Sequence, residues 1–515
     1  MLLSKSIARG AFGLVGAAAL ASAVSLPSPS DFKMHSISVN HELGGSTHQT
    51  SQLHVFEQPK GPDSSSKYFI GLSPAEAATL SWAEVNLKIG AGIEPEQRGV
   101  ADLHYEGSVS ESQIEEPTHL YSVTLPPYFM QNHDPNDRGI VTPNITVAVD
   151  LLFQHLSQPL PKSVSQKQDA SLQWQGDVHP RTPYGCPKVR VKARSPNPTV
   201  HSYSVDPPLE DETLASKTGA VVTFGPFGDI PPLKANTKIR KASVHYLFQG
   251  PIVGVVSLDR HVEVSHWAAA VSVQDRVWLR NNGPMLKGHF SRVDHQVGAF
   301  YGGAGRNLLT DFAIHLPSGA RDAYFVDQIG NVSTSHFRSA PADEAHVSKP
   351  SYQLANSGAS YLRLQPRYPL MGGWNYTFTT GWNLPSGEGG WVRRISGAGR
   401  REFSVAVPFW QAIQDVPADR VTTTIVLPEG ATVIDVQSPF AVDDEHKRSI
   451  STYLDTVGRP AIVLEKHRVS ERHSGNVYIR YSLDGPAHLL KPLSVAGAGM
   501  AAFATALIFR RLQAK

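Results

Sequence analysis

Residues 261–273 read HVEVSHWAAAVSV, and the run opens with the alternation His261-Val262-Glu263-Val264. Alternating polar and apolar side chains indicate a half-buried β-strand, because successive side chains of a strand point to opposite faces. The alternation recurs in residues 477–480, and other β-type runs lie at 146–153, 220–224, 246–258, 420–427 and 476–481. Turn residues interrupt the pattern at 281–284 (NNGP) and 428–430 (PEG), and helical patterns are confined to 74–87 and 408–416. The sequence therefore predicts a mainly β fold of antiparallel, sandwich-like domains with a few helices.

The N-terminal residues have the pattern of a secretory signal. Lys5 and Arg9 are positively charged, residues 10–20 are small or apolar, and Ala21-Ser22-Ala23 offers a cleavage site. The apolar run is shorter than the roughly 20 residues that a bilayer requires, which favours a cleaved signal over an N-terminal anchor. We expect residues 1–23 to be a signal peptide.

The C-terminal end predicts one membrane-spanning helix. Residues 493–509, LSVAGAGMAAFATALIF, contain no charged side chain, and Arg510, Arg511 and Lys515 follow them. Basic residues after an apolar span favour the cytosolic side, so we expect a span at 491–509, a cytosolic tail at 510–515 and the rest of the chain in the lumen. The alternatives are an apolar tail on a soluble protein and a lipid-anchor signal, and the basic residues disfavour the second.

The region between the two ends is long enough for two or three domains. The stretch PPLKANTKIRK at 231–241 separates two apolar runs, which predicts lumenal β domains at 24–235 and 236–488. Charge is nearly balanced, with 47 basic and 45 acidic residues, so nothing indicates a nucleic-acid partner.

Cysteine and glycosylation motifs bear on the compartment. Cys186 is the single cysteine, so an intramolecular disulfide cannot form, and without a basic cluster beside it we expect an inert thiol. Three Asn-x-Ser/Thr motifs make Asn144, Asn331 and Asn375 candidates for N-glycosylation, and all three lie in the part expected to be lumenal.

Eight segments in the second half resemble, in order, the ribophorin I family. They are GPFGDIP (225–231), DRHVEVSHW (259–267), LKGHFSR (286–292), DQIGNVSTSH (327–336), RYPLMGGW (367–374), GWNLP (381–385), LPEGA (427–431) and YLDTVGRP (453–460). The first half resembles the family more weakly, at 182–184 and 189–192. The end of the chain at Lys515 is similar to the short-tailed fungal members, which puts ribosome-side contacts in doubt.

The resemblance implies a non-catalytic subunit of the endoplasmic-reticulum oligosaccharyltransferase. That enzyme transfers a lipid-linked oligosaccharide from dolichyl diphosphate to Asn-x-Ser/Thr of nascent proteins. The implied partners are the other subunits, including the catalytic one, the nascent polypeptide, and the membrane through one helix.

Two partial catalytic motifs in the sequence are incomplete. HELGG at 41–45 lacks the second histidine of a zinc peptidase, and GLSPA at 71–75 lacks the closing glycine of a hydrolase elbow. His261, His266 and Trp267 lie at strand spacing, where structural histidines outnumber metal ligands. We predict no catalytic residue, metal or cofactor. The rivals are a lumenal hydrolase without a known motif and a type I membrane chaperone or lectin-like binding protein.

Overall fold

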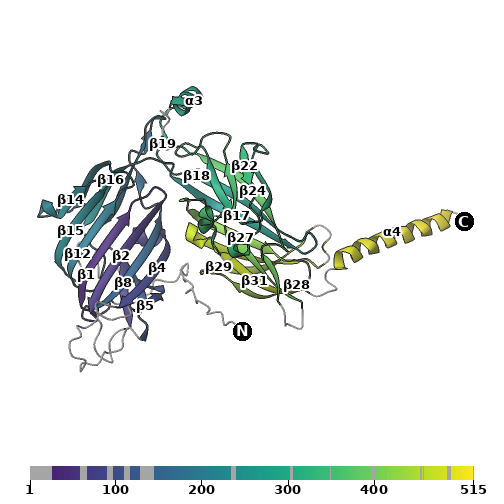
Figure 1. Ribbon diagram of the computed structural model, residues 1–515, viewed down its shortest axis with the longest axis horizontal. Helices are drawn as coiled ribbons and strands as arrows, with labels where there is room; N and C mark the ends of the chain where they lie inside the picture. Colours follow the sequence, from purple (N-terminus) through teal and green to yellow (C-terminus); the bar gives the residue numbers. More distant parts are fainter. Residues whose placement is uncertain are drawn as a thin grey trace.

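The computed structural model describes residues 26–57, 66–89, 97–109, 116–127, 144–233, 239–301, 306–347, 349–395, 401–411, 413–452, 455, 457–483 and 489–513. The expected signal segment at 1–23 lies outside these ranges. Strands dominate, and they form two groups that lie one after the other along the long axis (Figure 1). The prediction of a mainly β fold is confirmed.

The first group is a sandwich built on an eight-stranded sheet. In spatial order the strands are β14 (Ala215–Thr218), β15 (Val221–Ile230), β12 (Cys186–Arg194), β1 (Met34–Glu42), β2 (Thr47–Glu57), β8 (Asn144–Gln154), β4 (Leu80–Ile89) and β5 (Gln97–Ala101). Two smaller sheets share its core: β13 (Val200–Asp206), β16 (Lys241–Phe248), β11 (Ala170–Asp177) and β9 (Gln158–Pro159), and then β3 (Lys67–Leu72), β7 (Thr118–Thr124) and β6 (Leu103–Val109). Apolar side chains from all three sheets form one cluster that includes the buried Trp174.

The second group has a similar construction. Its main sheet runs β21 (Arg321–Asp327), β24 (Asn375–Pro385), β18 (Ala270–Asn281), β17 (Val253–Ser265), β27 (Ala418–Val426), β30 (Arg459–Val469) and β29 (Asp444–Ile450). Sheets of four and three strands share its core: β25 (Val392–Ile395), β26 (Glu402–Pro408), β31 (Asn476–Leu483) and β28 (Ala431–Gln437), and then β20 (Phe312–Leu316), β23 (Ser360–Leu364) and β22 (Ser335–Arg338). Three fully buried tryptophans, Trp382, Trp391 and Trp410, fill this core.

Most strand pairs are antiparallel, as predicted, but three are parallel. These are β1 with β12, β17 with β27, and the short pair β10 (Ser163–Val164) with β19 (Met285–Leu286). The last pair joins the two groups, because β10 belongs to the first half of the chain and β19 to the second. A second joint forms where Ser81 Oγ donates to the Arg468 carbonyl oxygen (2.7 Å) and Gln154 Nε2 donates to that of Val469 (2.9 Å).

The helices differ most from expectation. The predicted helix at 74–87 is helical only as α1 (Pro74–Thr79), because residues 80–89 alternate buried and exposed side chains and form β4. The predicted helix at 408–416 is wrong over its described residues: Pro408 ends β26, Ile413 forms an isolated β-bridge with Ile314, and Asp415 has a left-handed φ of 58°. Helix α3 (Arg292–Tyr301) was not predicted. Short 3-10 turns are η1 (Glu212–Leu214), η2 (Glu344–His346), η3 (Ser351–Asn356) and η4 (Glu471–His473).

Two predicted strand runs are divided by turns. Run 246–258 is interrupted between β16 and β17, and run 261–273 between β17 and β18. Since β16 pairs with β11 and β13 of the first group, we propose to divide the domains at residues 249–252 instead of between 235 and 236.

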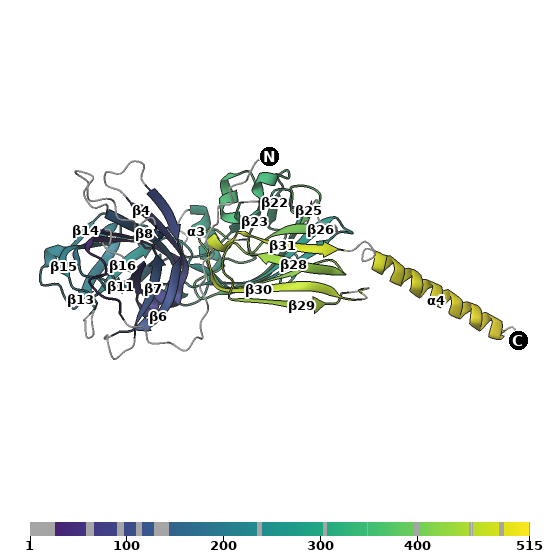
Figure 2. The same ribbon diagram turned by 90° about the horizontal axis from the view of Figure 1, so that it is seen from below.

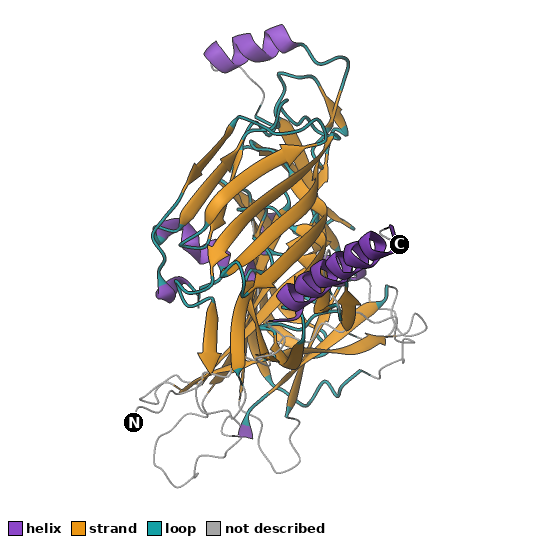
Figure 3. Ribbon diagram, turned by 90° about the vertical axis from the view of Figure 1, so that its right-hand side faces the viewer, coloured by secondary structure: helices purple, strands orange, loops and turns teal. Residues whose placement is uncertain are grey.

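Helix α4 (Leu490–Gln513) extends away from the second group (Figure 2), and it is seen foreshortened, in front of the strands, in Figure 3. Its segment Lys491–Gln513 is long and apolar enough to cross a membrane, with a mean hydropathy of 1.7, and it is not buried against the sheets. The helix covers the span predicted at 491–509.

Candidate functional site

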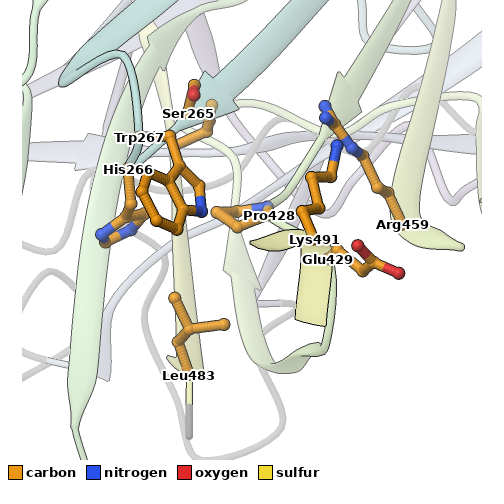
Figure 4. Close-up of a pocket in the computed structure, with 9 residues that line it drawn as sticks. Ser265, His266, Trp267, Pro428, Glu429, Arg459, Leu483 and Lys491 are labelled. Atoms are coloured by element: carbon orange, nitrogen blue, oxygen red, sulfur yellow. The ribbon is translucent and has the colours of Figure 1, made fainter. Parts of the chain in front are cut away.

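A cavity of about 140 Å³ lies beside the first turn of α4 (Figure 4). Three of the segments that resemble the ribophorin I family meet there, although residues 264 and 459 of the lining are far apart in the sequence. The lining residues are Val264, Ser265, His266, Trp267, Pro428, Glu429, Arg459, Leu483 and Lys491. The parallel pairing of β17 with β27 and the antiparallel pairing of β27 with β30 bring these segments together.

One wall of the cavity is aromatic. Trp267 lies on the turn between β17 and β18, and it is 64% exposed. Its neighbour His266 forms a 2.7 Å hydrogen bond through Nε2 with the Tyr481 hydroxyl and packs edge-on against Phe403. His266 thus fixes the turn, and Trp267 presents an apolar ring with a polar N–H to the surroundings. The strand spacing expected for His261, His266 and Trp267 holds only for His261, because β17 ends at Ser265 and the other two lie on the turn after it.

The opposite wall is charged. Lys491 Nζ lies 2.8 Å from Asp455 Oδ1, and Arg459 Nε lies 3.3 Å from the same oxygen. Arg459 also pairs with Glu263. Burial by itself would raise the pKa of the Asp455 carboxyl, but hydrogen bonds from Lys491 and Thr452 and the charge of Arg459 hold that pKa well below its usual range. The carboxylate therefore stays ionised and ties the start of α4 to the loop before β30.

The residues considered for catalysis have structural roles. His41 is buried and shares a 2.9 Å hydrogen bond with Thr50, and burial lowers its pKa to about 4. Ser73 caps α1, accepting from the Glu76 N–H (3.3 Å). Over the described ranges, no group of three or more His, Cys, Asp or Glu side chains is placed to hold a metal ion. Cys186 is buried, and burial raises the pKa of its thiol, which fits the expected inert cysteine.

The three glycosylation candidates differ in exposure. Asn331 and Asn375 are exposed, whereas Asn144, the first residue of β8, is partly buried. Asn331 and Asn375 lie near each other, because Arg367 donates to the Asn331 carbonyl oxygen (2.9 Å) and the adjacent Tyr368 hydroxyl donates to that of Asn375 (3.4 Å). Glycosylation at all three positions stays a prediction.

A buried ion pair lies within the main sheet of the second strand group. Arg260 is paired directly across from Asp275, with Nε–Oδ1 and Nη2–Oδ2 distances of 2.7 and 2.6 Å, and its Nη1 donates to the Pro408 carbonyl oxygen (2.8 Å). This pair was not predicted, although the sequence carries a signal for it: Arg260 shares the inward parity of Leu258 and Val262 on β17.

Fold and site together define a mainly β protein with one C-terminal helix of membrane-spanning length and a charged, aromatic cavity at the base of that helix. The chain belongs to the ribophorin I family, whose model matches residues 32–510.

Named relatives align over most of the chain. Subunit 1 of the dolichyl-diphosphooligosaccharide–protein glycosyltransferase of Caenorhabditis elegans is 27% identical over 466 residues, covering 90% of this chain and 69% of that protein. Subunit 1A of Arabidopsis thaliana is 28% identical, covering 86% and 62%. Subunit 1B of Oryza sativa subsp. japonica is 30% identical, covering 68% and 67%. Among solved structures, leukotriene A4 hydrolase from Saccharomyces cerevisiae matches 45% of this chain and 31% of that one at 13% identity, but its TM-score of 0.23 supports no argument.

Proposed function

We propose that this chain is a non-catalytic subunit of the endoplasmic-reticulum oligosaccharyltransferase, which glycosylates Asn-x-Ser/Thr sites of nascent proteins. The observation that carries the proposal is the family match over residues 32–510, together with relatives named as subunit 1 of that glycosyltransferase. The role is to support assembly of the complex and handling of the acceptor chain, in contact with the other subunits, including the catalytic one, and with the nascent polypeptide.

The topology in this proposal is single-pass type I. Residues 1–23 direct the chain to the endoplasmic reticulum, α4 spans its membrane, residues 510–515 face the cytosol, and both strand groups lie in the lumen with glycans on the exposed sequons. Trp267 suits this arrangement, because tryptophan favours the membrane–water interface and Trp267 borders the same cavity as Lys491 in the first turn of α4.

The cavity supports a structural role for the membrane-proximal end. Its two cations, Arg459 and Lys491, are both engaged by carboxylates, so the charges hold the helix and the loop before β30 in one arrangement. A fixed arrangement would set the height and tilt of the lumenal sheets over the membrane, as a scaffold subunit requires.

The test is purification at native size. The C-terminally tagged chain is extracted from membranes in a mild detergent and assayed for transfer of a lipid-linked oligosaccharide to an Asn-x-Thr peptide. We expect a large assembly with transfer activity that is lost on depletion of the tagged chain, whereas the chain freed from the assembly shows no transfer. Depletion of an unrelated single-span lumenal protein is the control. An isolated chain, with full activity left in the depleted membranes, would refute the proposal and favour the chaperone or lectin-like alternative.

A further inference from the structure

Helix α3 presents an apolar face that no described part of the chain covers. Val293, Val297, Phe300 and Tyr301 are 70, 51, 82 and 79% exposed. Their spacing of four, three and one residues places them in one stripe along the helix. Figures 1 and 3 show α3 standing out beyond both strand groups. Such a contiguous exposed stripe marks an interaction surface more often than scattered apolar residues do.

Residues 166–167, which belong to the first strand group, form hydrogen bonds and an ion pair with the start of α3. Ser291 N–H donates to Gln166 Oε1 (2.8 Å), and Gln166 Nε2 donates to the Ser291 carbonyl oxygen (2.9 Å). Lys167 pairs with Asp294 at 3.0 Å, and the parallel pair of β10 with β19 lies just before α3. A free helix of ten residues would be marginal in water, so these contacts hold the apolar stripe in one orientation.

The position of α3 disfavours a lipid surface as its partner. Strand β18 starts at the turn that carries Trp267, near the base of α4, and ends at Asn281, shortly before β19 and α3. Twelve residues at a rise of about 3.3 Å place α3 roughly 40 Å from the base of α4. With α4 in the membrane, as in the proposed function, α3 therefore faces the aqueous lumen.

The base of α3 is basic. Lys162, Lys287 and Arg292 are exposed, and none of them forms an ion pair within the described ranges. Lys162 and Lys287 flank the β10–β19 pair, and Arg292 is the first residue of α3, so the three charges surround the segment that attaches α3 to the strands. A surface that complements this one has an apolar groove with an acidic rim.

We propose that α3 inserts its apolar stripe into an acidic-rimmed groove on the lumenal domain of another subunit of the same complex. The proposal rests on the proposed function and adds the surface through which the lumenal parts assemble. Phe300 and Val297 are the residues that enter the groove. The basic residues at the base of α3 orient the helix against the acidic edge of that groove.

The first test is photocrosslinking with the full chain in native membranes. A photoreactive phenylalanine analogue replaces Phe300, and a matched chain carries it at Ile329, which is also 80% exposed but lies on a turn of the second strand group. We expect the Phe300 probe to crosslink to one subunit of the complex and the Ile329 probe not to. Crosslinks to lipid, to a second copy of this chain or to nothing would overturn the proposal.

The second test measures retention of the chain in the complex. We expect Val297→Asp/Phe300→Asp to reduce the amount that copurifies with transfer activity by about tenfold or more, because hot-spot anchors are lost and the new charges meet an acidic rim. Ile329→Asp is the control and should copurify like the wild type. Lys287→Glu/Arg292→Glu tests the rim without touching the apolar stripe, and it should also reduce retention. If either the Val297→Asp/Phe300→Asp or the Lys287→Glu/Arg292→Glu chain copurifies fully with an active complex, this inference fails while the proposed function stands; if the wild type does not copurify with activity, both fail.

Discussion

Replacing Asp275 by asparagine should destabilise the second strand group more than any surface change. Arg260 lies in the interior of the main sheet, and Asp275 supplies both of its carboxylate contacts. In Asp275→Asn the guanidinium remains buried, with the Pro408 carbonyl and a neutral amide as its partners. Removing one partner of a buried pair typically costs about 3–5 kcal/mol, because the remaining charge stays desolvated.

The assay is thermal unfolding of the purified full chain in mild detergent. For a unit of this size each kcal/mol lowers the unfolding midpoint by about 2–4 °C, so we expect the transition of the second group to fall by roughly 6–20 °C. The first group should keep its midpoint, because its core cluster is separate.

Two controls separate the buried charge from the loss of packing. Arg420→Gln breaks the exposed pair with Glu465 and should cost at most about 1 kcal/mol. Arg260→Met/Asp275→Leu removes both charges, so it should recover much of the loss, short of the roughly 1–3 kcal/mol for the Pro408 carbonyl left without its donor. If Asp275→Asn shifts the midpoint no more than Arg420→Gln does, the pair is not a buried anchor and the reasoning is refuted.

Three further predictions concern other parts of the chain. Asp455→Asn should lower the free energy of unfolding by about 1–3 kcal/mol in a denaturant titration, since Lys491 loses its ionised acceptor; an unchanged midpoint would contradict the assigned tie to α4. His54 is buried, and burial lowers its pKa from 6.5 to about 4, so the folded state binds fewer protons than the unfolded one between these values. The stability it contributes should be present above pH 6.5 and lost as the pH falls toward 4; thermal midpoints measured across this range should fall less steeply for His54→Gln, and an equal slope would contradict the assignment. Asn331→Gln and Asn375→Gln should each remove one endoglycosidase-sensitive mobility shift on a gel, and unshifted wild-type chain would show that the sites are unused.

The strands could be predicted from the sequence because period-two alternation is a local signal. Residues 146–153 and 476–481 each lie within one observed strand, and β27 contains residues 420–426 of the run predicted at 420–427. The two helix predictions were wrong, in whole or in part, because they also used local signals alone. Helix-start signals at Ser73 and Pro74 are real, but the alternation of residues 80–89 turns the chain into a strand six residues later. In α3 the helical stripe is only ten residues long and ends beside glycines, so it gives a weak pattern.

The site could be predicted only in its parts. The segments around Trp267, Glu429 and Arg459 were each recognised by resemblance, but their convergence depends on the order of β17, β27 and β30 in the sheet. Strand order is set by contacts between residues far apart in sequence, and alternation fixes only which side chains face inward. The ion pair between Asp455 and Lys491 was not predicted, because it also depends on how separate segments pack together.

Two exposed apolar surfaces lie at opposite ends of β18, and they require different surroundings. Helix α4 is tied to the second group through the pair of Lys491 with Asp455, while the rest of its length is uncovered. If α4 spans the membrane as proposed, its position depends on lipid and on neighbouring helices, which its small residues Gly497 and Gly499 allow to approach closely. The base of α3 is held by Gln166 and Lys167, so a protein groove can bind the apolar stripe without first ordering it. If both are covered as proposed, the rigid sheet between them links membrane contacts to lumenal contacts. Loss of the α3 anchors should then weaken retention of the chain in the whole complex, because only the α4 contacts remain to hold it.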